Sequence, residues 1–339
     1  MNQHPGDLSV PTGSLARIVV VDTGQADGRD LSVEMENFPV NFELRQFTYK
    51  GVSAQLIEAC SQADAVLTDY AEFDREVLEK MPHCKVISVA ATGWDCVDID
   101  AAKDLGISVC CINEYCTDEV ADHTLALILA LNRKLFAYHQ QVQDQLSWAY
   151  DDISGIHRLS GQSLGIIGFG RIGRAVAKRA AGFGINVLVF DPYQKDYKAE
   201  ACVVELDTLL RKSDIISLHT SLNRNNLNMI DGGAFLKMER KPMLINVARG
   251  ALVDEKALVY ALDHGLISGA ALDVLSDEPP SLKKHPLLDR ENVILTPHVA
   301  FYSEQSMLEN RRVSALNITN FLAGRFHAVS RFVNHAKNP

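Results

Sequence analysis

A short glycine-rich segment carries the residue types and spacing best suited to chemistry. Gly168-Phe-Gly-Arg-Ile-Gly173 has the spacing G-x-G-x-x-G and lies between an apolar run at 164–167 and a helical pattern at 174–181. The first glycine permits a tight turn, the second lets backbone approach a pyrophosphate, and the third lets the helix pack on the strand. The helix N-terminus then offers unpaired N–H groups to phosphates. The segment predicts a dinucleotide site.

An acidic residue follows where this motif expects one. A second apolar run, at 186–190, ends in Asp191, and the next residue is Pro192 rather than an arginine. A carboxylate here binds the ribose hydroxyls of NAD and repels the 2′-phosphate of NADP. The alternative is a structural turn followed by an unrelated surface aspartate. The order of strand, glycines, helix, strand and acid favours NAD, and the residues that we expect to contact it are Gly168, Gly170, Arg171, Ile172, Gly173 and Asp191.

Three later strand candidates also end in polar residues. Arg249 follows one, Asp273 follows the next with Glu278 five residues on, and His298 follows the last. Ligands of open α/β sheets bind at the carboxyl ends of strands. Arginine matches a carboxylate with two parallel donors, and histidine titrates near neutrality. Taken singly, a surface salt bridge explains the arginine and a structural hydrogen bond explains the histidine. Together they predict reduction of a ketone, with a carboxylate beside the histidine stabilising the imidazolium.

Composition sets the frame for this chemistry. A chain of 339 residues is long enough for about two domains. A net charge of −10 argues against a general nucleic-acid or membrane-surface binder, and no apolar run approaches the ~20 residues of a membrane span. The N-terminus lacks the pattern of a signal peptide. Seven cysteines without metal spacing indicate small apolar residues in a reducing cytosol, so we expect a cytoplasmic protein without a metal site.

Strand and helix patterns alternate on both sides of the glycine segment, which predicts an α/β protein with parallel sheets. We expect two doubly wound domains: a flavodoxin-like substrate domain of residues 1–115 and 306–339, and a Rossmann NAD-binding domain of residues 116–305 inserted into it. A long helix over 118–138 opens the inserted domain, and residues 141–158 are expected as a helix followed by a loop. Ser303 is the expected N-cap of a last long helix to about residue 322, with no strand after it.

The ordered motifs resemble the D-isomer-specific 2-hydroxyacid dehydrogenase family over nearly the whole chain. The matching pieces are Gly168-x-Gly-x-x-Gly173 with Asp191, Asn246-Val-Ala-Arg-Gly250, Asp273-Val with Glu278-Pro279, and Thr296-Pro-His298. The resemblance implies that Arg249 binds and polarises a 2-oxo acid, that His298 is the acid/base, and that Glu278 pairs with it.

The resemblance implies further contacts. Asp273 would hold the nicotinamide carboxamide, and the backbone amides of Thr92 and Gly93 would face the substrate carboxylate. The remaining positions implied for the cofactor are Thr117, His219, Thr220, Val247 and Ala248, and those implied for the substrate are Trp94 and Phe301.

Within the family the sequence is most similar to the branch of the C-terminal-binding protein corepressors. His219-Thr-Ser-Leu-Asn223 lacks the proline that most members have after His-x, as does that branch. Phe301 replaces a tryptophan of the branch. The chain ends at Pro339 without the long tail of those corepressors, which favours a plain enzyme.

The leading hypothesis is an NAD-dependent oxidoreductase that interconverts a small 2-oxo acid and its D-2-hydroxy acid. An NAD(H)-sensing scaffold is one alternative, and a phosphoglycerate dehydrogenase is another, although no cluster of Arg and Lys stands beside Thr92 in the sequence. We expect a homodimer formed through the NAD-binding domain, with the aromatic segment around Trp148 and Tyr150 at the interface and Trp148 reaching the partner's active site.

Overall fold

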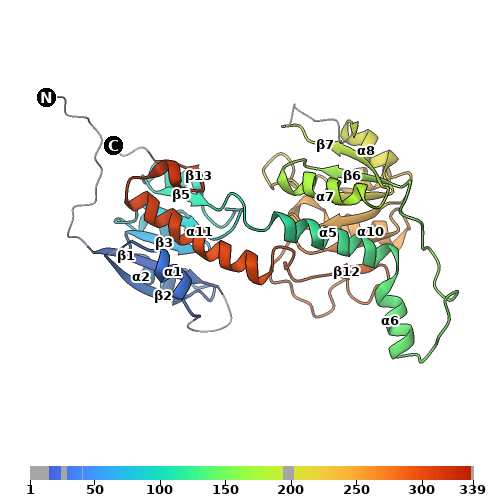
Figure 1. The fold of residues 1–339 in the computed structure, drawn as a ribbon, viewed down its shortest axis with the longest axis horizontal. Helices are drawn as coiled ribbons and strands as arrows, with labels where there is room; N and C mark the ends of the chain where they lie inside the picture. Colours follow the sequence, from blue (N-terminus) through green and yellow to red (C-terminus); the bar gives the residue numbers. More distant parts are fainter. Residues whose placement is uncertain (1–14, 24–28, 40, 194–201, 337–339) are drawn as a thin grey trace. The chain divides into compact units, whose positions relative to one another are not determined.

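The chain folds into two compact α/β units. The structure is a computed structural model that describes residues 15–23, 29–39, 41–193 and 202–336 (Figure 1). Unit 1 comprises Met1–Tyr115 and Ser303–Pro339, and unit 2 comprises Cys116–Tyr302. None of the helices in the described ranges combines the length and the apolar composition needed to cross a membrane.

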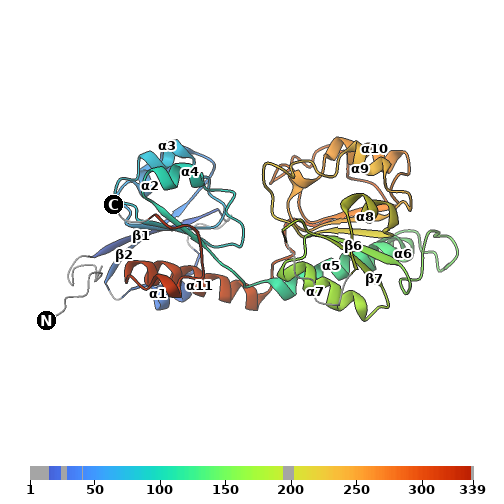
Figure 2. The same ribbon diagram turned by 90° about the horizontal axis from the view of Figure 1, so that it is seen from above.

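Unit 1 is a doubly wound sheet. Its parallel strands lie in the order β2-β1-β3-β4-β5, the flavodoxin-like order, and antiparallel β13 closes the β5 edge. Figure 2 shows α2, α3 and α4 on one face of this sheet and α1 and α11 on the other. The strands are β1 (Ala16–Asp22), β2 (Phe42–Thr48), β3 (Ala65–Thr68), β4 (Val86–Val89), β5 (Ser108–Cys111) and β13 (Arg331–Asn334). The helices are α1 (Ser32–Asn37), α2 (Ser53–Cys60), α3 (Arg75–Glu79), α4 (Ile99–Asp104), α11 (Glu304–Leu322) and the 3-10 turn η2 (Phe326–Ala328).

Apolar residues fill both faces of this sheet. Strands β3, β4 and β5 are buried along their whole length, as expected for strands covered on two sides. On the α11 face, Ala315, Ile318 and Leu322 pack against Ile18 and Val20 of β1. The helix that returns from the end of the chain is thereby an integral part of the unit 1 core.

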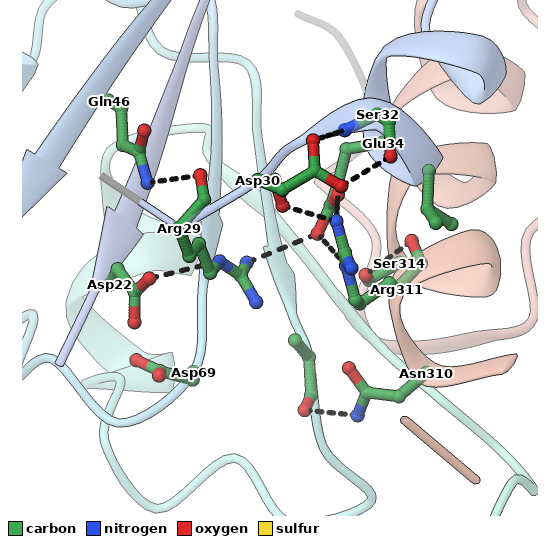
Figure 3. A network of polar contacts seen from close by, with 12 residues as sticks. Asp22, Arg29, Asp30, Ser32, Glu34, Gln46, Asp69, Asn310, Arg311 and Ser314 are labelled. Carbon is green, nitrogen blue, oxygen red and sulfur yellow. Dashed lines mark hydrogen bonds and ion pairs between the residues drawn. The ribbon is translucent and has the colours of Figure 1, made fainter. Parts of the chain in front are cut away.

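A buried ion network joins α1 to α11 (Figure 3). Glu34 is fully buried and accepts two hydrogen bonds from Arg311, at 2.8 Å and 2.6 Å. Arg29 lies 3.2 Å from the same carboxylate and 2.9 Å from Asp22 at the end of β1. A buried carboxylate is tolerated only when it is paired in this way. The network therefore fixes the last helix against the first.

Unit 2 is an all-parallel sheet in the order β12-β11-β10-β9-β6-β7-β8. Counted from β6, this is the Rossmann strand order with one further strand at the β12 edge. Helices α8, α9 and α10 cover one face, and α5 and α7 the other (Figure 2). The strands are β6 (Ser163–Ile167), β7 (Asn186–Phe190), β8 (Cys202–Val203), β9 (Ile215–Leu218), β10 (Met243–Asn246), β11 (Gly269–Leu272) and β12 (Val293–Leu295). The helices are α5 (Thr117–Asn132), α6 (Leu135–Gln143), α7 (Arg171–Ala181), α8 (Leu206–Lys212), α9 (Gly232–Leu236), α10 (Glu255–Asp263) and the 3-10 turn η1 (Gly250–Leu252). The fold class predicted from the sequence is confirmed.

Three predictions of secondary structure were wrong. The helix expected over 118–138 ends at Asn132, because Lys134 takes a left-handed conformation with φ of 53° and a new helix, α6, begins after it. Helix α6 stops at Gln143, so most of residues 141–158 lie outside any helix. The prediction that no strand follows the last helix was also wrong, because β13 pairs with β5.

The cysteines are free thiols, and most are packed in the interior. Burial raises the pKa of the Cys60 and Cys110 thiols to about 12, so both stay neutral and behave as apolar groups. No group of three or more His, Cys, Asp or Glu side chains in the described ranges is arranged to hold a metal ion. The cytoplasmic location stays a prediction.

Candidate active site

The glycine segment forms the turn between β6 and α7. Gly168 has φ of 93°, and a side chain there would meet the backbone of His219 at 2.6 Å. A Cβ on Gly173 would lie 2.3 Å from the Gly168 carbonyl oxygen. Gly170, in contrast, has no atom of the described residues within 4 Å of its would-be Cβ and stands exposed at the start of α7. Two glycines therefore permit close packing, while the middle one leaves open space at the amide end of a helix.

Asp191 lies beside this turn. Its Oδ2 accepts a hydrogen bond from the Phe169 N–H at 2.7 Å, and its Oδ1 accepts one from the Tyr193 N–H at 2.9 Å. These two bonds fix the carboxylate directly after β7, one strand away from the glycines. A carboxylate has further lone pairs, so it can still accept from a ligand hydroxyl.

His219 packs against the glycine turn from the end of β9. Its Nε2 lies 2.8 Å from the Ser217 hydroxyl, and its Nδ1 is buried without a hydrogen-bond partner in the described ranges. Burial lowers the pKa of His219 to about 3, so the ring is neutral at physiological pH. Thr220 follows, and its backbone nitrogen would lie 2.7 Å from a Cβ on Gly168.

The segment after β10 is fixed by Asn246. This side chain is buried, accepts a hydrogen bond from the Ala248 N–H at 3.1 Å and donates one to the Arg249 carbonyl at 2.9 Å. The Arg249 Nη1 donates to the Ala248 carbonyl at 2.8 Å. Val247 and Ala248 pack on opposite hydrophobic clusters of unit 2, so the turn is held from both faces. Arg249 is thereby presented, half-buried, at the carboxyl end of a central strand.

Asp273 organises the loop that carries His298. The carboxylate is buried and accepts hydrogen bonds from the Thr296 hydroxyl at 2.5 Å and from the Val299 and Ala300 N–H groups, both at 2.9 Å. The His298 N–H donates to the Asp273 carbonyl at 2.7 Å. His298 itself has φ of 50°, a conformation that costs a non-glycine residue ~1 kcal/mol or more and is kept only where the surroundings fix it.

A second histidine, His123 of α5, supports this loop. Its Nε2 lies 3.2 Å from the Thr296 hydroxyl oxygen and 3.6 Å from Asp273 Oδ1. Because the Thr296 hydroxyl already donates to Asp273, its oxygen is the acceptor toward His123, which makes Nε2 the protonated ring nitrogen. Nothing in the sequence pattern singled out His123, because it lies on the interior side of a helix far along the chain from Thr296.

His298 and Glu278 form a direct pair. The His298 Nδ1 lies 2.6 Å from Glu278 Oε2, and the other carboxylate oxygen accepts a hydrogen bond from the Leu275 N–H at 3.1 Å. A carboxylate accepts hydrogen bonds, so Nδ1 is the ring nitrogen that carries the proton toward Glu278. The Phe301 ring stands edge-on to the His298 ring, with centroids 5.9 Å apart.

Backbone packing connects this pair to Arg249. A Cβ on Gly250 would lie 1.9 Å from the carbonyl atoms of Leu275, so only glycine allows the two segments to touch. Leu275 in turn positions Glu278, and Glu278 positions His298. The predicted residues Arg249, Glu278 and His298 are therefore parts of one contiguous assembly at the carboxyl edge of unit 2, next to a dinucleotide-type glycine turn. This combination defines a dinucleotide-dependent oxidoreductase.

The predicted substrate loop lies in unit 1, after β4. Ala91 accepts a hydrogen bond from the Ile112 N–H at 2.9 Å, and the Trp94 carbonyl accepts one from Val97 at 3.0 Å. The N–H groups of Thr92 and Gly93 have no acceptor in the described part of the chain. Two adjacent unpaired amides are suited to bind an anion. Thr117, predicted to contact the cofactor, is the first residue of α5 in unit 2.

Comparison with known proteins agrees with this class. Residues 125–300 match the family described as D-isomer specific 2-hydroxyacid dehydrogenase, NAD binding domain. The chain is 37% identical over 306 residues to glycerate dehydrogenase of Methylorubrum extorquens, which covers 87% of this chain and 94% of that enzyme. It is 36% identical over 274 residues to D-3-phosphoglycerate dehydrogenase of Archaeoglobus fulgidus, which covers 80% of this chain and 51% of that enzyme.

A solved structure agrees as well. D-lactate dehydrogenase from Aquifex aeolicus, solved with NAD and lactic acid, gives a TM-score of 0.83 at 31% identity over 93% of this chain and 98% of that one. The chain therefore belongs to the D-isomer-specific 2-hydroxyacid dehydrogenase family. The protein is therefore an enzyme that uses a nicotinamide cofactor to oxidise a 2-hydroxy acid or to reduce the corresponding 2-oxo acid. The similarity to the corepressor branch stays a prediction.

Proposed function

We propose that the protein uses NAD(H) to interconvert a small 2-oxo acid, such as glyoxylate, hydroxypyruvate or a longer homologue, and its D-2-hydroxy acid. The observation that carries the proposal is the His298–Glu278 pair at 2.6 Å, connected through Leu275 and Gly250 to Arg249. A general acid, its carboxylate partner and a carboxylate-binding guanidinium are what ketone reduction requires besides a hydride donor.

His298 is the proposed acid/base. The nicotinamide supplies or accepts the hydride when it is bound. During reduction His298 Nε2 donates a proton to the developing alkoxide, and during oxidation it takes that proton back. Glu278 holds Nδ1–H, which fixes the ring and stabilises the imidazolium form that gives up the proton. The unusual backbone of His298 is kept by the Asp273 loop, so the ring is positioned before substrate binds.

Arg249 and the Thr92 loop are the proposed anchors for the acid. The guanidinium binds the 2-oxo acid and polarises its carbonyl, since Arg pairs with carboxylates through two parallel hydrogen bonds. The unpaired N–H groups of Thr92 and Gly93 donate hydrogen bonds to the C1 carboxylate. Phe301, edge-on to His298, is proposed to border the substrate side chain.

The residues around the glycine turn fit NAD. Gly170 leaves room for a pyrophosphate at the start of α7, while Asp191 presents a carboxylate at the end of β7. That carboxylate binds a ribose diol and repels a 2′-phosphate, which selects NAD over NADP. The further positions proposed to contact the cofactor are Thr117, Arg171, Ile172, Gly173, His219, Thr220, Val247, Ala248 and Asp273.

The test is a panel of 2-oxo acids assayed with NADH and NADPH side by side. We expect turnover of glyoxylate, hydroxypyruvate, pyruvate or a longer homologue with NADH, and a marked preference for NADH over NADPH. No turnover of any member, together with normal NADH binding, would contradict the proposal and favour an NADH-sensing scaffold. Preference for 3-phosphohydroxypyruvate over every unphosphorylated 2-oxo acid would instead make the protein a phosphoglycerate dehydrogenase.

We also propose that the protein is a homodimer that associates through unit 2. Large apolar side chains are exposed on and after α6, among them Phe136. The most exposed are Leu146 at 88%, Trp148 at 92% and Tyr150 at 86%. Exposed apolar patches of this kind are typical of protein interfaces. Light scattering at micromolar concentration should give a dimer, and Trp148→Ala should weaken it. Loss of turnover in a Trp148→Ala dimer would support a role for Trp148 in the partner's active site.

A further inference from the structure

The start of β13 lies at the same edge of the unit 1 sheet as the Thr92 loop. Strand β13 runs antiparallel to β5, with Arg331 opposite Cys111, the last residue of β5. Its first residue therefore stands at the carboxyl end of the parallel strands, where doubly wound sheets bind ligands. The Ile112 N–H, one residue further, donates to the Ala91 carbonyl at the base of the loop. This placement could not be predicted from the sequence, because β13 itself was not predicted.

Arg331 stacks on the loop. Its guanidinium carbon lies 4.7 Å from the centroid of the Trp94 ring, within the range of a cation–π contact. Two other arginines of unit 1 are held by carboxylates, Arg17 by Asp64 and Arg311 by Glu34. Arg331 has no carboxylate within 4.0 Å in the described ranges and is exposed. The Trp94 face orients this guanidinium but leaves its N–H donors available to an anion.

The loop thus carries two separate features for negative charge: the amides of Thr92 and Gly93, and the guanidinium of Arg331. The two amides match a single carboxylate, so a substrate with one carboxylate leaves Arg331 unused. A planar fork of N–H donors is suited to a carboxylate or a phosphate. We propose that Arg331, held on Trp94, is a specificity-determining residue that binds a second anionic group at the far end of the 2-oxo acid. This inference rests on the proposed function.

The test compares 2-oxo acids of matched length with and without the second anion. One arm pairs 2-oxoglutarate with 2-oxovalerate, and the other pairs 3-phosphohydroxypyruvate with hydroxypyruvate. In at least one of the two pairs, Arg331→Gln should lower kcat/KM for the acid with the second anion by about 10- to 100-fold, the effect of one charge-assisted hydrogen bond. It should lower kcat/KM for the matched acid without that anion by less than about threefold. The arm that responds distinguishes a carboxylate from a phosphate. Arg331→Lys, which keeps the charge but not the fork, should lose less.

The control is Arg312→Gln, which removes an exposed guanidinium of α11 that pairs with Glu309. It should change neither kcat/KM value. Equal losses on both members of each pair would overturn the inference, since Arg331 would then act only by holding Trp94. Unchanged ratios in both arms would overturn it as well. If Arg331→Gln has a lower melting temperature than the wild type, Arg331→Lys is used instead. A larger loss of kcat/KM for the acid with the second anion than for its matched acid then supports the inference, and equal losses overturn it. Failure of the proposed function is distinct, because the wild type would then reduce neither these four acids nor glyoxylate or pyruvate. A wild type that reduces glyoxylate or pyruvate but none of the four acids would overturn this inference alone.

Discussion

The two sheets end in opposite chemistry at the points where their strand order reverses. In unit 2, β6 ends in Gly168 and the amides of α7, a combination suited to phosphate. In unit 1, β1 ends in Asp22, and Asp69 follows β3, its neighbour in the sheet. Burial raises the pKa of Asp69, and the charge of Asp22 raises it further. Two related architectures therefore offer the amides of a helix at one switch point and two neighbouring carboxyl groups at the corresponding point of the other.

The two edges are also held in place by different means. In unit 2 the backbone itself is packed so closely that Gly168 and Gly250 have no room for a methyl group. In unit 1 a buried ion network of Arg29, Glu34 and Arg311 performs this task. Substitution of a glycine should therefore damage unit 2 most, and substitution of a charge should damage unit 1 most.

The largest effect is expected on kcat when His298, the proposed acid/base of unit 2, is replaced. His298→Ala removes the proposed proton donor, so kcat should fall by about 10²- to 10⁴-fold. NADH binding, measured by fluorescence titration, should stay within about threefold of the wild type, because the glycine turn is untouched. Glu278→Gln should lower kcat too, since a neutral amide stabilises the imidazolium less. A His298→Ala enzyme with wild-type turnover would refute the assigned role.

The charge network of unit 1 is tested by Arg311→Met. This change leaves Glu34 with one fewer partner in a fully buried site, which should cost about 3–5 kcal/mol of the free energy of unfolding. The matched control is Arg312→Met on the same helix, whose exposed pair with Glu309 should contribute under about 1 kcal/mol. Native-state hydrogen exchange of β1 and α11 amides measures both. Equal exchange in the two variants would remove the contrast between the units.

The backbone packing of unit 2 is tested by Gly250→Ala. The added methyl group would meet Leu275 and displace Glu278 and Arg249 relative to each other, so kcat/KM should fall by about 100-fold. Gly170→Ala adds the same methyl group into open space, so it should preserve the thermal stability of unit 2 and weaken only NADH binding. Steady-state rates and thermal melts of both variants supply the comparison. If Gly250→Ala matched the wild type in both, the connection between Arg249 and Glu278 would lie elsewhere.

The smallest effect is expected at Asp69 of unit 1, which lies beside Asp22 at the ends of β3 and β1. Because the pKa of Asp69 is raised in the folded protein, its ionised form destabilises unit 1 at pH values above the folded pKa, and this loss disappears below the unfolded value of 3.8. Asp69→Asn should raise the melting temperature by about 1–3 °C at pH 8. The gain should shrink as the pH is lowered toward 3.8. A gain that does not depend on pH would show that charge is not its cause.

Much of unit 2 could be predicted because each motif directly follows a buried strand. In a parallel sheet the carboxyl ends of all strands lie at one edge, so Gly168, Asp191, His219, Arg249, Asp273 and His298 had to lie along the same edge. The order of the motifs along the chain was enough for this inference.

The contacts that depend on distant segments could not be predicted. Strand β13 is a short edge strand that begins with a charged residue, so its sequence lacks the alternation of a buried strand. Its pairing with β5 brings Arg331 onto Trp94, although the two residues lie far apart in the sequence. His123 was missed for the same reason. The break at Lys134 depends on a single left-handed residue within an otherwise helical pattern.

The most direct test of the proposed reaction is transfer of deuterium from NADH carrying it at the reactive C4 position. The wild-type enzyme, supplied with a 2-oxo acid that it reduces, should give a 2-hydroxy acid of D configuration with the deuterium at C2, as read by mass spectrometry and chiral chromatography. His298→Ala should form the same labelled product at a rate lowered by about 10²- to 10⁴-fold. An unlabelled product, or one of L configuration, would contradict the proposal.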